Sequence, residues 1–313
     1  MKKALAVFLC LLMILPVTAS AQDVYESTED VYIGDCYLPY RLIVPEGYNE
    51  KYEYPLLVFF HGAGERGTDN IRQLNNCVQY ITDNMPKAII LVPQCPSEAR
   101  WVETDWGNGS YSVDEVPESA QLKTVIELVG ELKKQYSIDS DCVYAAGISM
   151  GGYAVWDVMI RHNDIFAAGI AVCGAGDPSK AEVLKDTPMF VFHGDCDDTV
   201  PVSGSRDMVE AIEAAGGTQV EYLEYSGSGH GIWDMAFRSE GLLTKLQRYK
   251  LSDRYQPVDN PGDQGGQSGD LDLPQYLPYI FLGVAVLVAV VMVVVLLSGN
   301  KKKEDEEEKK PEE

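Results

Sequence analysis

Basic residues are scarce in this chain of 313 residues, which has 25 lysines and arginines against 48 aspartates and glutamates and a formal net charge of −23. Proteins bind nucleic acids and anionic membrane surfaces through clustered positive charge, so this balance argues against nucleic acid as a partner. Histidine is rarer still, with 4 residues. Any catalytic base of that type therefore comes from a very short set of candidates.

The chain also lacks the cysteine and histidine spacing of a zinc site, and we expect neither a metal nor a cofactor. Six cysteines follow residue 21, an even number that permits disulfides in an exported protein. Those in apolar runs, Cys142 and Cys173, are more typical of small buried hydrophobic residues. The six are Cys36, Cys77, Cys95, Cys142, Cys173 and Cys196.

Long apolar runs occur only at the two ends of the chain. Residues 1–21 combine a basic start, an apolar stretch and small residues at 19–21, a pattern typical of a cleaved signal peptide. Residues 276–297 are uncharged and long enough to cross a bilayer, and three lysines follow within the tail at 298–313. We therefore predict a single-pass membrane protein whose catalytic domain is extracellular, with residues 253–275 as a flexible stalk. A buried core helix is the alternative for 276–297.

Between these ends, residues 22–252 form one predicted domain without an internal repeat. Short apolar runs alternate with amphipathic segments, which is the pattern of a mostly parallel sheet flanked by helices. The predicted strands are 56–60, 88–92, 143–146, 168–172 and 189–192, with an antiparallel edge at 38–44. The predicted helices are 119–136, 203–215 and 233–249. Residues 174–188 leave no room for a large cap domain, and the long connection 93–117 is of a length that is usually functional or mobile.

A nucleophile elbow follows one of these strands, in the segment Gly147-Ile148-Ser149-Met150-Gly151. Small residues around Ser149 allow a sharp turn from strand to helix, which raises its hydroxyl above the sheet. The pattern alone is common, but here it stands after a strand and before a helix. We therefore predict an α/β-hydrolase fold with Ser149 as the nucleophile, an ordinary strand-to-helix turn being the alternative.

The base that activates a serine follows it in the chain of this fold, after an acidic residue. His162 precedes every candidate acid, and His61 and His193 end apolar strands, where an imidazole more often bonds backbone. His230 remains, in the glycine-rich loop 227–231. We predict it as the general base.

The acid is expected in the loop 193–201, which offers Asp195, Asp197 and Asp198. Chain order does not choose among the three. The oxyanion formed during acyl transfer needs hydrogen-bond donors, for which we predict the backbone N–H of Met150 and an N–H of the glycine-rich loop 61–67.

These residues resemble a known group, the exported α/β-hydrolase esterases described as predicted peptidases or phospholipase/carboxylesterases, close to feruloyl and acetylxylan esterases. The resemblance covers about residues 38–246. It rests on the segments 54–56, 61–70, 92–96, 147–153 and 166–168, and on His230 with Trp233 and Asp234. The His-Gly-x-x-Asp-x-x-Val-Pro pattern of such enzymes matches residues 193–201 and implies that Asp197 is the acid. The resemblance also implies Ala63 as the second oxyanion donor.

The leading hypothesis is a serine carboxylesterase. Its substrates would be polysaccharide fragments that carry feruloyl or acetyl groups, or small esters. Trp101, Trp106 and Trp233 could stack on a sugar or phenolic ring, with packing under a long loop as the alternative. Two rivals stay open: a serine peptidase of the prolyl-oligopeptidase type, and a surface binding module without catalysis. A binding module would be expected to have lost the nucleophile or the base, whereas this sequence has both Ser149 and His230.

Overall fold

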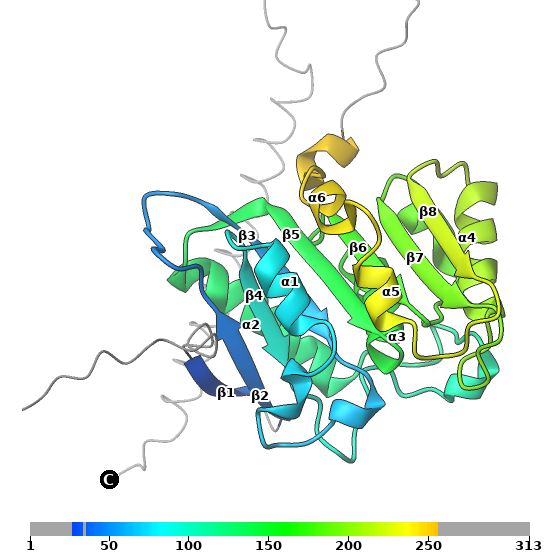
Figure 1. Ribbon diagram of the computed structural model, residues 1–313, viewed down its shortest axis with the longest axis horizontal. Coiled ribbons are helices and arrows are strands. Elements are labelled where there is room, and N and C mark those ends of the chain that lie inside the picture. The colour runs from blue at the N-terminus through cyan, green and yellow to red at the C-terminus, as the bar shows by residue number, and fades with distance from the viewer. Residues whose placement is uncertain (1–26, 34–35, 256–313) are drawn as a thin grey trace, which may run out of the picture. The chain divides into compact units, whose positions relative to one another are not determined.

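A single sheet with helices on both faces organises the chain in the computed structural model, which describes residues 27–33 and 36–255 (Figure 1). The sheet has eight strands in the order β1-β2-β4-β3-β5-β6-β7-β8. The strands are β1 (Ser27–Ile33), β2 (Cys36–Ile43), β3 (Tyr54–Phe60), β4 (Ile89–Pro93), β5 (Ile138–Ile148), β6 (Ala168–Val172), β7 (Met189–Gly194) and β8 (Val220–Tyr225).

The six strands from β4 to β8 run parallel to their neighbours, whereas β2 pairs antiparallel with both β1 and β4. Parallel strands buried on both faces read as continuous apolar runs, and β4 and β6 have no exposed residue. The predicted α/β-hydrolase fold, a mostly parallel sheet flanked by helices, is confirmed. The antiparallel segment predicted at 38–44 is present as β2. A further antiparallel strand, β1, lies outside that segment, at the edge of the sheet.

Helices divide between the two faces of the sheet, and each face has its own apolar core. The helices are α1 (Val78–Asn84), α2 (Ala120–Gln135), α3 (Met150–Arg161), α4 (Ser203–Ala214), α5 (Trp233–Phe237) and α6 (Leu242–Leu246). Buried residues of α2, α3 and α4 cluster with alternate strand residues such as Val58. The buried residues of α1, α5 and α6 cluster with the strand residues that point to the opposite face, such as Phe59. Period-two alternation along each strand therefore serves two cores.

The predicted helix at 233–249 is wrong as a single element. It consists of α5 and α6, separated by Gly241, whose φ of 71° lies in the left-handed region. A glycine there tolerates that conformation and ends continuous helical hydrogen bonding. Strand β8, at the edge of the sheet, has only partly buried or exposed residues and was absent from the predicted apolar strands.

The long connection 93–117 is tied to the domain by buried contacts. Trp101 is completely buried and its Nε1–H donates to the His61 carbonyl (3.2 Å). The Tyr111 hydroxyl donates to Asp157 of α3 (2.9 Å), and Arg161 of α3 donates to the Val113 carbonyl (3.1 Å). Burial raises the pKa of Asp157, and the charge of Arg161 opposes that shift. The connection is therefore fastened to α3 along its length.

The six cysteines that follow residue 21 are all free thiols, and Cys196 alone among them is exposed. The predicted signal peptide, the transmembrane segment 276–297 and the tail 298–313 lie outside the described residues, as does all of the predicted stalk after residue 255.

Within residues 27–33 and 36–255, no helix combines the length and apolarity that crossing a bilayer requires. The longest described helix, α2, has 16 residues and carries Glu127, Glu131 and Lys133 among others, whereas a span needs about 20 consecutive apolar residues. This finding overturns the predicted membrane location with an extracellular catalytic domain, and we withdraw that prediction.

Candidate active site

Ser149 occupies a tight turn between β5 and α3, close to the middle of the sheet. Its φ of 54° and ψ of −120° are unusual for a residue with a side chain, and such conformations persist only where surrounding structure imposes them. Its backbone N–H donates to the Val172 carbonyl at the end of β6 (2.8 Å). The turn is thus fixed to the neighbouring strand, and the hydroxyl stays partly exposed.

Two glycines make this turn possible by letting three backbones meet. A Cβ on Gly151 would lie 1.9 Å from the Phe60 carbonyl oxygen, and one on Gly147 would lie 2.3 Å from the Gly151 oxygen. Both distances are far below contact. The start of α3 therefore packs directly on the ends of β3 and β5, as the predicted elbow requires.

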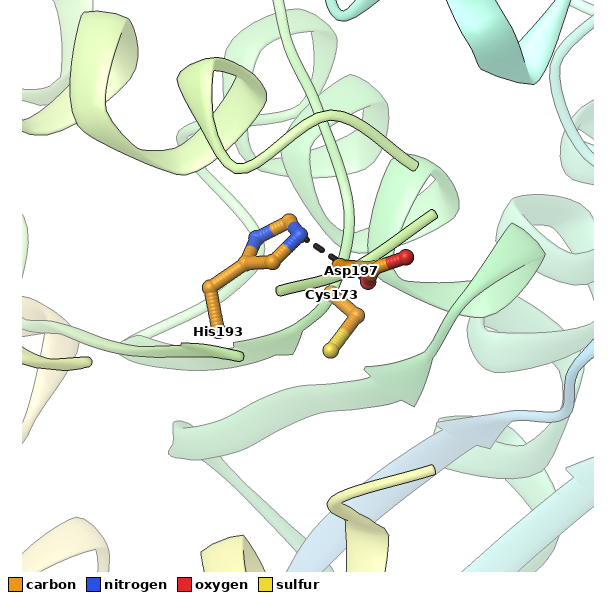
Figure 2. Close-up of side chains that lie close together, drawn as sticks. All are labelled: Cys173, His193 and Asp197. Atoms are coloured by element: carbon orange, nitrogen blue, oxygen red, sulfur yellow. Dashed lines mark ion pairs between the residues drawn. The ribbon is translucent and has the colours of Figure 1, made fainter. Parts of the chain in front are cut away.

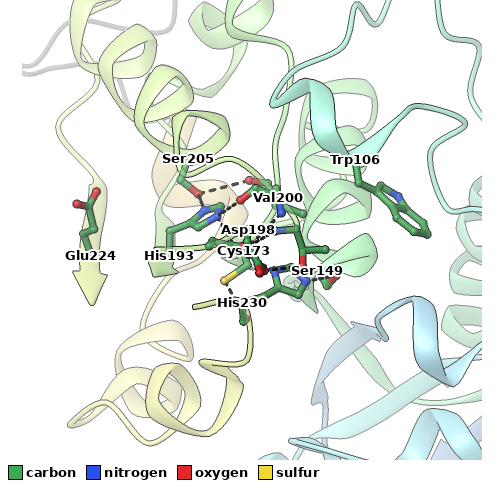
Figure 3. Close-up of polar contacts among 12 residues, drawn as sticks. Trp106, Ser149, Cys173, His193, Asp198, Val200, Ser205, Glu224 and His230 are labelled. Carbon is green, nitrogen blue, oxygen red and sulfur yellow. Dashed lines mark hydrogen bonds and ion pairs between the residues drawn. The ribbon is translucent and has the colours of Figure 1, made fainter. Parts of the chain in front are cut away.

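His230 lies opposite Ser149, in the loop between β8 and α5. The Ser149 hydroxyl donates to His230 Nε2 (2.7 Å) (Figure 3). At the other ring nitrogen, His230 Nδ1–H donates to Asp197 Oδ2 (2.6 Å). The Cys173 thiol donates to the His230 carbonyl (3.4 Å), and the Trp233 ring stands edge-on to the imidazole with centroids 4.9 Å apart. The ring is therefore held at both nitrogens and from one side.

Asp197, which follows β7, is the one of the three candidate acids that reaches His230. Its Oδ1 accepts the backbone N–H groups of Thr199 and Val200, both at 2.9 Å. Asp195 instead accepts the N–H of Gly227, and Asp198 accepts the Thr199 hydroxyl. Burial would raise the pKa of Asp197, but donors from the two histidines and the two backbone groups hold it well below its usual range. Asp197 is therefore ionised at neutral pH.

The two candidate oxyanion donors, the backbone N–H groups of Met150 and Ala63, both lie at helix starts. Met150 is the first residue of α3 and Ala63 the first of a short 3₁₀ helix at Ala63–Glu65, so neither N–H has an acceptor within its helix. A Cβ on Gly62 would lie 3.6 Å from Ser149 Cβ, which places this loop against Ser149. Arg66 fixes the loop by donating to the carbonyls of Ala63 (3.0 Å) and Ala99 (3.2 Å).

These groups open into a cavity of about 260 Å³. Its lining residues are Gly62, Ala63, Gly64, Glu65, Asn76, Trp106, Ile148, Ser149, Thr199, His230 and Trp233. Sequence reasoning missed Asn76 and Thr199 as lining residues. Asn76 has a φ of 60°, and its amide donates to Glu65 Oε1 (3.1 Å). No spacing in the sequence connects Asn76 to the elbow, because its place depends on the turn before α1.

The three tryptophans proposed for substrate contact separate in the structure. Trp106 and Trp233 line the cavity, whereas Trp101 is buried in the core beside Phe60 and does not reach it. Trp106 is covered by Arg100, whose guanidinium carbon lies 4.4 Å from the ring centroid, and by Arg66 at 5.7 Å. Such cation–π contacts hold the indole in place.

Residues 47–240 match the phospholipase/carboxylesterase family, which is more than half of the chain. The chain belongs to this family. The resemblance to phospholipase/carboxylesterases inferred from the sequence is thereby confirmed, and with it the enzyme class of carboxylesterase-type serine hydrolases, whereas the predicted export is not shown by this match. The catalytic roles of the individual residues remain predictions that the geometry supports.

Individual relatives of this carboxylesterase-family chain agree over shorter stretches. A bifunctional acetylxylan esterase/xylanase from Neocallimastix patriciarum is 24% identical over 146 residues, 47% of this chain and 20% of that protein. The esterase LipC of Mycobacterium tuberculosis is 46% identical over 72 residues, 23% of this chain and 16% of that protein. The chain thus spans about a fifth or less of the curated relatives that it matches.

Among solved structures, a thermostable esterase is 33% identical with a TM-score of 0.66, covering 73% of this chain and 64% of that one. A ferulic acid esterase from Anaeromyces mucronatus in complex with ferulic acid is 16% identical with a TM-score of 0.54, covering 74% of this chain and 93% of that one. At that level of identity the second likeness shows the fold alone.

His61, directly after β3, fixes the loop that contains the candidate oxyanion donor Ala63, and it does so as a neutral imidazole. Its Nδ1–H donates to the Gly62 carbonyl (2.6 Å), and its Nε2 accepts the backbone N–H of Cys95 (2.9 Å). A proton on Nε2 would point at the Cys95 N–H, which is also a donor, so protonation of His61 would break this hydrogen bond. Burial, opposed by the Gly62 hydrogen bond and assisted by Arg66, lowers the pKa of His61 to about 4.

We expect this histidine to make the protein labile to mild acid. The unfolded chain takes up a proton near pH 6.5, while folded His61 resists it down to a pKa of about 4. The free energy of unfolding should therefore fall by about 3 kcal/mol as the pH drops through this window. Urea unfolding at pH 7.5, 5.5 and 4.5 measures the loss.

The matched control for that measurement is His162→Gln, on a partly exposed histidine that directly follows α3, which should keep the full loss. His61→Gln should reduce the slope by one proton, about 1.4 kcal/mol per pH unit. A flat stability between pH 6.5 and 4.5 in the unchanged protein would contradict the assignment.

Proposed function

We propose that this chain hydrolyses carboxylic esters through an acyl-enzyme, with Ser149 as nucleophile, His230 as general base and Asp197 as the residue that orients His230. One observation carries the proposal: an unbroken series of hydrogen bonds, 2.7 Å and 2.6 Å long, from the Ser149 hydroxyl through both nitrogens of His230 to Asp197. An ionised Asp197 requires His230 to carry its hydrogen on Nδ1, which leaves Nε2 free to take the serine proton.

In the proposed reaction Ser149 Oγ attacks the acyl carbon as its proton passes to His230 Nε2. The carbonyl oxygen becomes an oxyanion, which accepts hydrogen bonds from the N–H groups of Met150 and Ala63. The C–O bond to the alcohol then breaks, and His230 returns its proton to the leaving alkoxide. Water repeats the sequence on the acyl-enzyme, which releases the acid and restores the Ser149 hydroxyl.

The lining of the cavity supports a neutral ester with a short or aromatic acyl group. Glu65 is its one charged residue apart from the titratable His230, so an anionic substrate would meet a like charge. A volume of about 260 Å³ is at the small end for ligand sites, which disfavours long acyl chains. Trp106 and Trp233 line the cavity and supply aromatic surface for a phenolic or sugar ring, with the guanidinium groups of Arg100 and Arg66 over part of the Trp106 ring. We therefore propose acetyl or feruloyl esters of carbohydrates, in line with the activities named for the acetylxylan and ferulic acid esterases above.

A substrate panel tests this proposal: nitrophenyl acetate, methyl ferulate, acetylated and feruloylated xylo-oligosaccharides, a nitrophenyl palmitate and a peptide nitroanilide. We expect kcat/KM for the short and aromatic esters to exceed that for the palmitate and the anilide by at least about 10²-fold. A preference for the anilide would establish a peptidase instead. Absence of Ser149 labelling by a fluorophosphonate, together with absence of ester hydrolysis, would establish a binding module.

A further inference from the structure

A second histidine contacts the carboxylate that orients the proposed base. His193, completely buried at the end of β7, has its Nε2 3.2 Å from Asp197 Oδ2 and 3.1 Å from the Val200 carbonyl (Figure 2). Both partners are acceptors, so Nε2 carries a hydrogen. On the other side of the ring, the Ser205 hydroxyl of α4 donates to Nδ1 (2.7 Å) (Figure 3).

Asp197 Oδ2 therefore lies between two imidazoles, each of which has a serine at its far nitrogen. The series runs from Ser205 through His193, Asp197 and His230 to Ser149. Asp197 accepts three hydrogen bonds, two from backbone N–H groups at Oδ1 and one from His230 at Oδ2, and His193 Nε2 adds a fourth polar contact at Oδ2. The carboxylate cannot turn without losing at least one of these contacts. The single Nε2–H of His193 is thus shared between the Val200 carbonyl and the carboxylate of Asp197.

We propose that His193, with its tautomer fixed by Ser205, is a positioning residue that holds Asp197 where Oδ2 accepts from His230. The proposal rests on the function proposed above. His193 also shares the charge of Asp197, which weakens the stabilisation that the carboxylate gives to protonated His230. Removal of the His193 donor should therefore strengthen the attraction between the Asp197 carboxylate and protonated His230.

The third group within this cluster does not compete for the role. Cys173, His193 and Asp197 have atoms within 4.8 Å of one another, an arrangement that could be read as a metal site. Burial raises the pKa of the Cys173 thiol well above its usual range, so it remains protonated and donates to the His230 carbonyl. Both remaining side chains already bond each other. The donor set therefore fits a hydrogen-bonded support for Asp197.

Few other titratable groups face this pair. They are the Cys173 thiol after β6, the Tyr153 phenol of α3, the Glu224 carboxylate of β8 and His230 itself. Glu224 is paired with Arg206 of α4 through bonds of 2.6 and 2.8 Å. Burial raises the pKa of Tyr153, which keeps the phenol neutral. A change in the acidic limb of the pH–rate profile on altering His193 thus reports on the Asp197–His230 pair.

The test compares His193→Phe, which keeps a ring without donors, with His193→Gln, whose side-chain amide can replace Nε2–H. For nitrophenyl acetate we expect His193→Phe to lower kcat about 10²-fold with KM within about twofold, and to move the acidic limb of kcat/KM upward by about half a pH unit or more. His193→Gln should retain kcat within about fivefold and an unmoved limb. The rate of fluorophosphonate labelling of Ser149 should follow kcat.

Ser205→Ala gives a second route if His193→Phe does not fold, because it removes the partner of His193 Nδ1 while losing only one further contact, with the Gly174 carbonyl (3.4 Å). It should lower kcat about threefold to tenfold. Asp198→Asn is the matched control, because Asp198 is an exposed residue of the same loop that bonds the Thr199 hydroxyl (3.2 Å), and it should match the unchanged protein. Folded His193→Phe or Ser205→Ala with unchanged kcat and limb, or His193→Gln as impaired as His193→Phe, would overturn the proposal. Lack of hydrolysis by the unchanged protein would instead overturn the proposed function.

Discussion

Replacing Ser149 by alanine is expected to lower kcat for nitrophenyl acetate by about 10⁴- to 10⁶-fold and to leave KM within a few-fold. The substitution removes the atom that forms the acyl-enzyme, while the cavity and the proposed oxyanion donors Met150 and Ala63 stay in place. What remains is hydrolysis by water in the cavity. The measurement is steady-state hydrolysis together with the loss of fluorophosphonate labelling.

Ser252→Ala is the matched control for that experiment. Ser252 is an exposed serine whose hydroxyl donates to Asp141 (2.8 Å), remote from the cavity in the chain and absent from its lining. Its replacement should leave kcat unchanged and labelling complete. If Ser149→Ala, shown to be folded by its unfolding midpoint, hydrolysed the ester at more than about one hundredth of the original rate, another group would have to be the nucleophile.

Replacing Gly151 by alanine should have the largest effect on stability. The added carbon would lie 1.9 Å from the Phe60 carbonyl oxygen and 2.9 Å from that of His61, both of them backbone atoms that cannot turn aside. Helix α3 would have to leave the end of β3, which opens the core between them. We expect a loss of about 4 kcal/mol or more, which corresponds to a fall in melting temperature of roughly 10 °C for a domain of this size.

Gly130→Ala provides the contrast, since Gly130 lies inside α2 and a Cβ there would meet nothing within 4 Å. Alanine stabilises a helix interior relative to glycine, so this variant should gain about 0.5–1 kcal/mol. Thermal unfolding of both variants and the unchanged protein decides the matter. A Gly151→Ala protein with an unchanged melting temperature would show that α3 does not pack on β3 as described.

Local chemistry explains which parts of the fold were predictable from the sequence. Strands β3 to β7 are apolar because both faces are buried, and this signal does not depend on what packs against them. The turn at Ser149 was predictable for a similar reason, since its glycines are needed within the segment itself. Strand β8 was not predicted because it lies at the edge of the sheet, where Glu221 and Leu223 are exposed and the sequence has no apolar run.

The rest depends on contacts between distant segments. Trp101 and Trp106 stand five residues apart in the same loop, yet only Trp106 reaches the cavity, because Trp101 turns inward to Phe60. Likewise, His193 was interpreted as a histidine that bonds backbone, which it does through Val200. Its second contact, with Asp197, arises because the loop folds back over the end of β7. The periodicity of apolar residues and the propensity for helix or strand carry no information on how a loop folds back onto a strand.

The order of strands in the sheet also has a consequence for how the site assembles. Ser149 follows β5, whereas Asp197 follows β7 and His230 follows β8. Strand β6 lies between β5 and β7 in the sheet. The serine and the imidazole are 81 residues apart, so they meet only when the outer strands have docked in succession. A chain with β3 to β5 in place would hold the nucleophile without its base. The rate at which a refolding sample regains reactivity toward a fluorophosphonate should therefore time the last docking event, behind the recovery of helical circular dichroism.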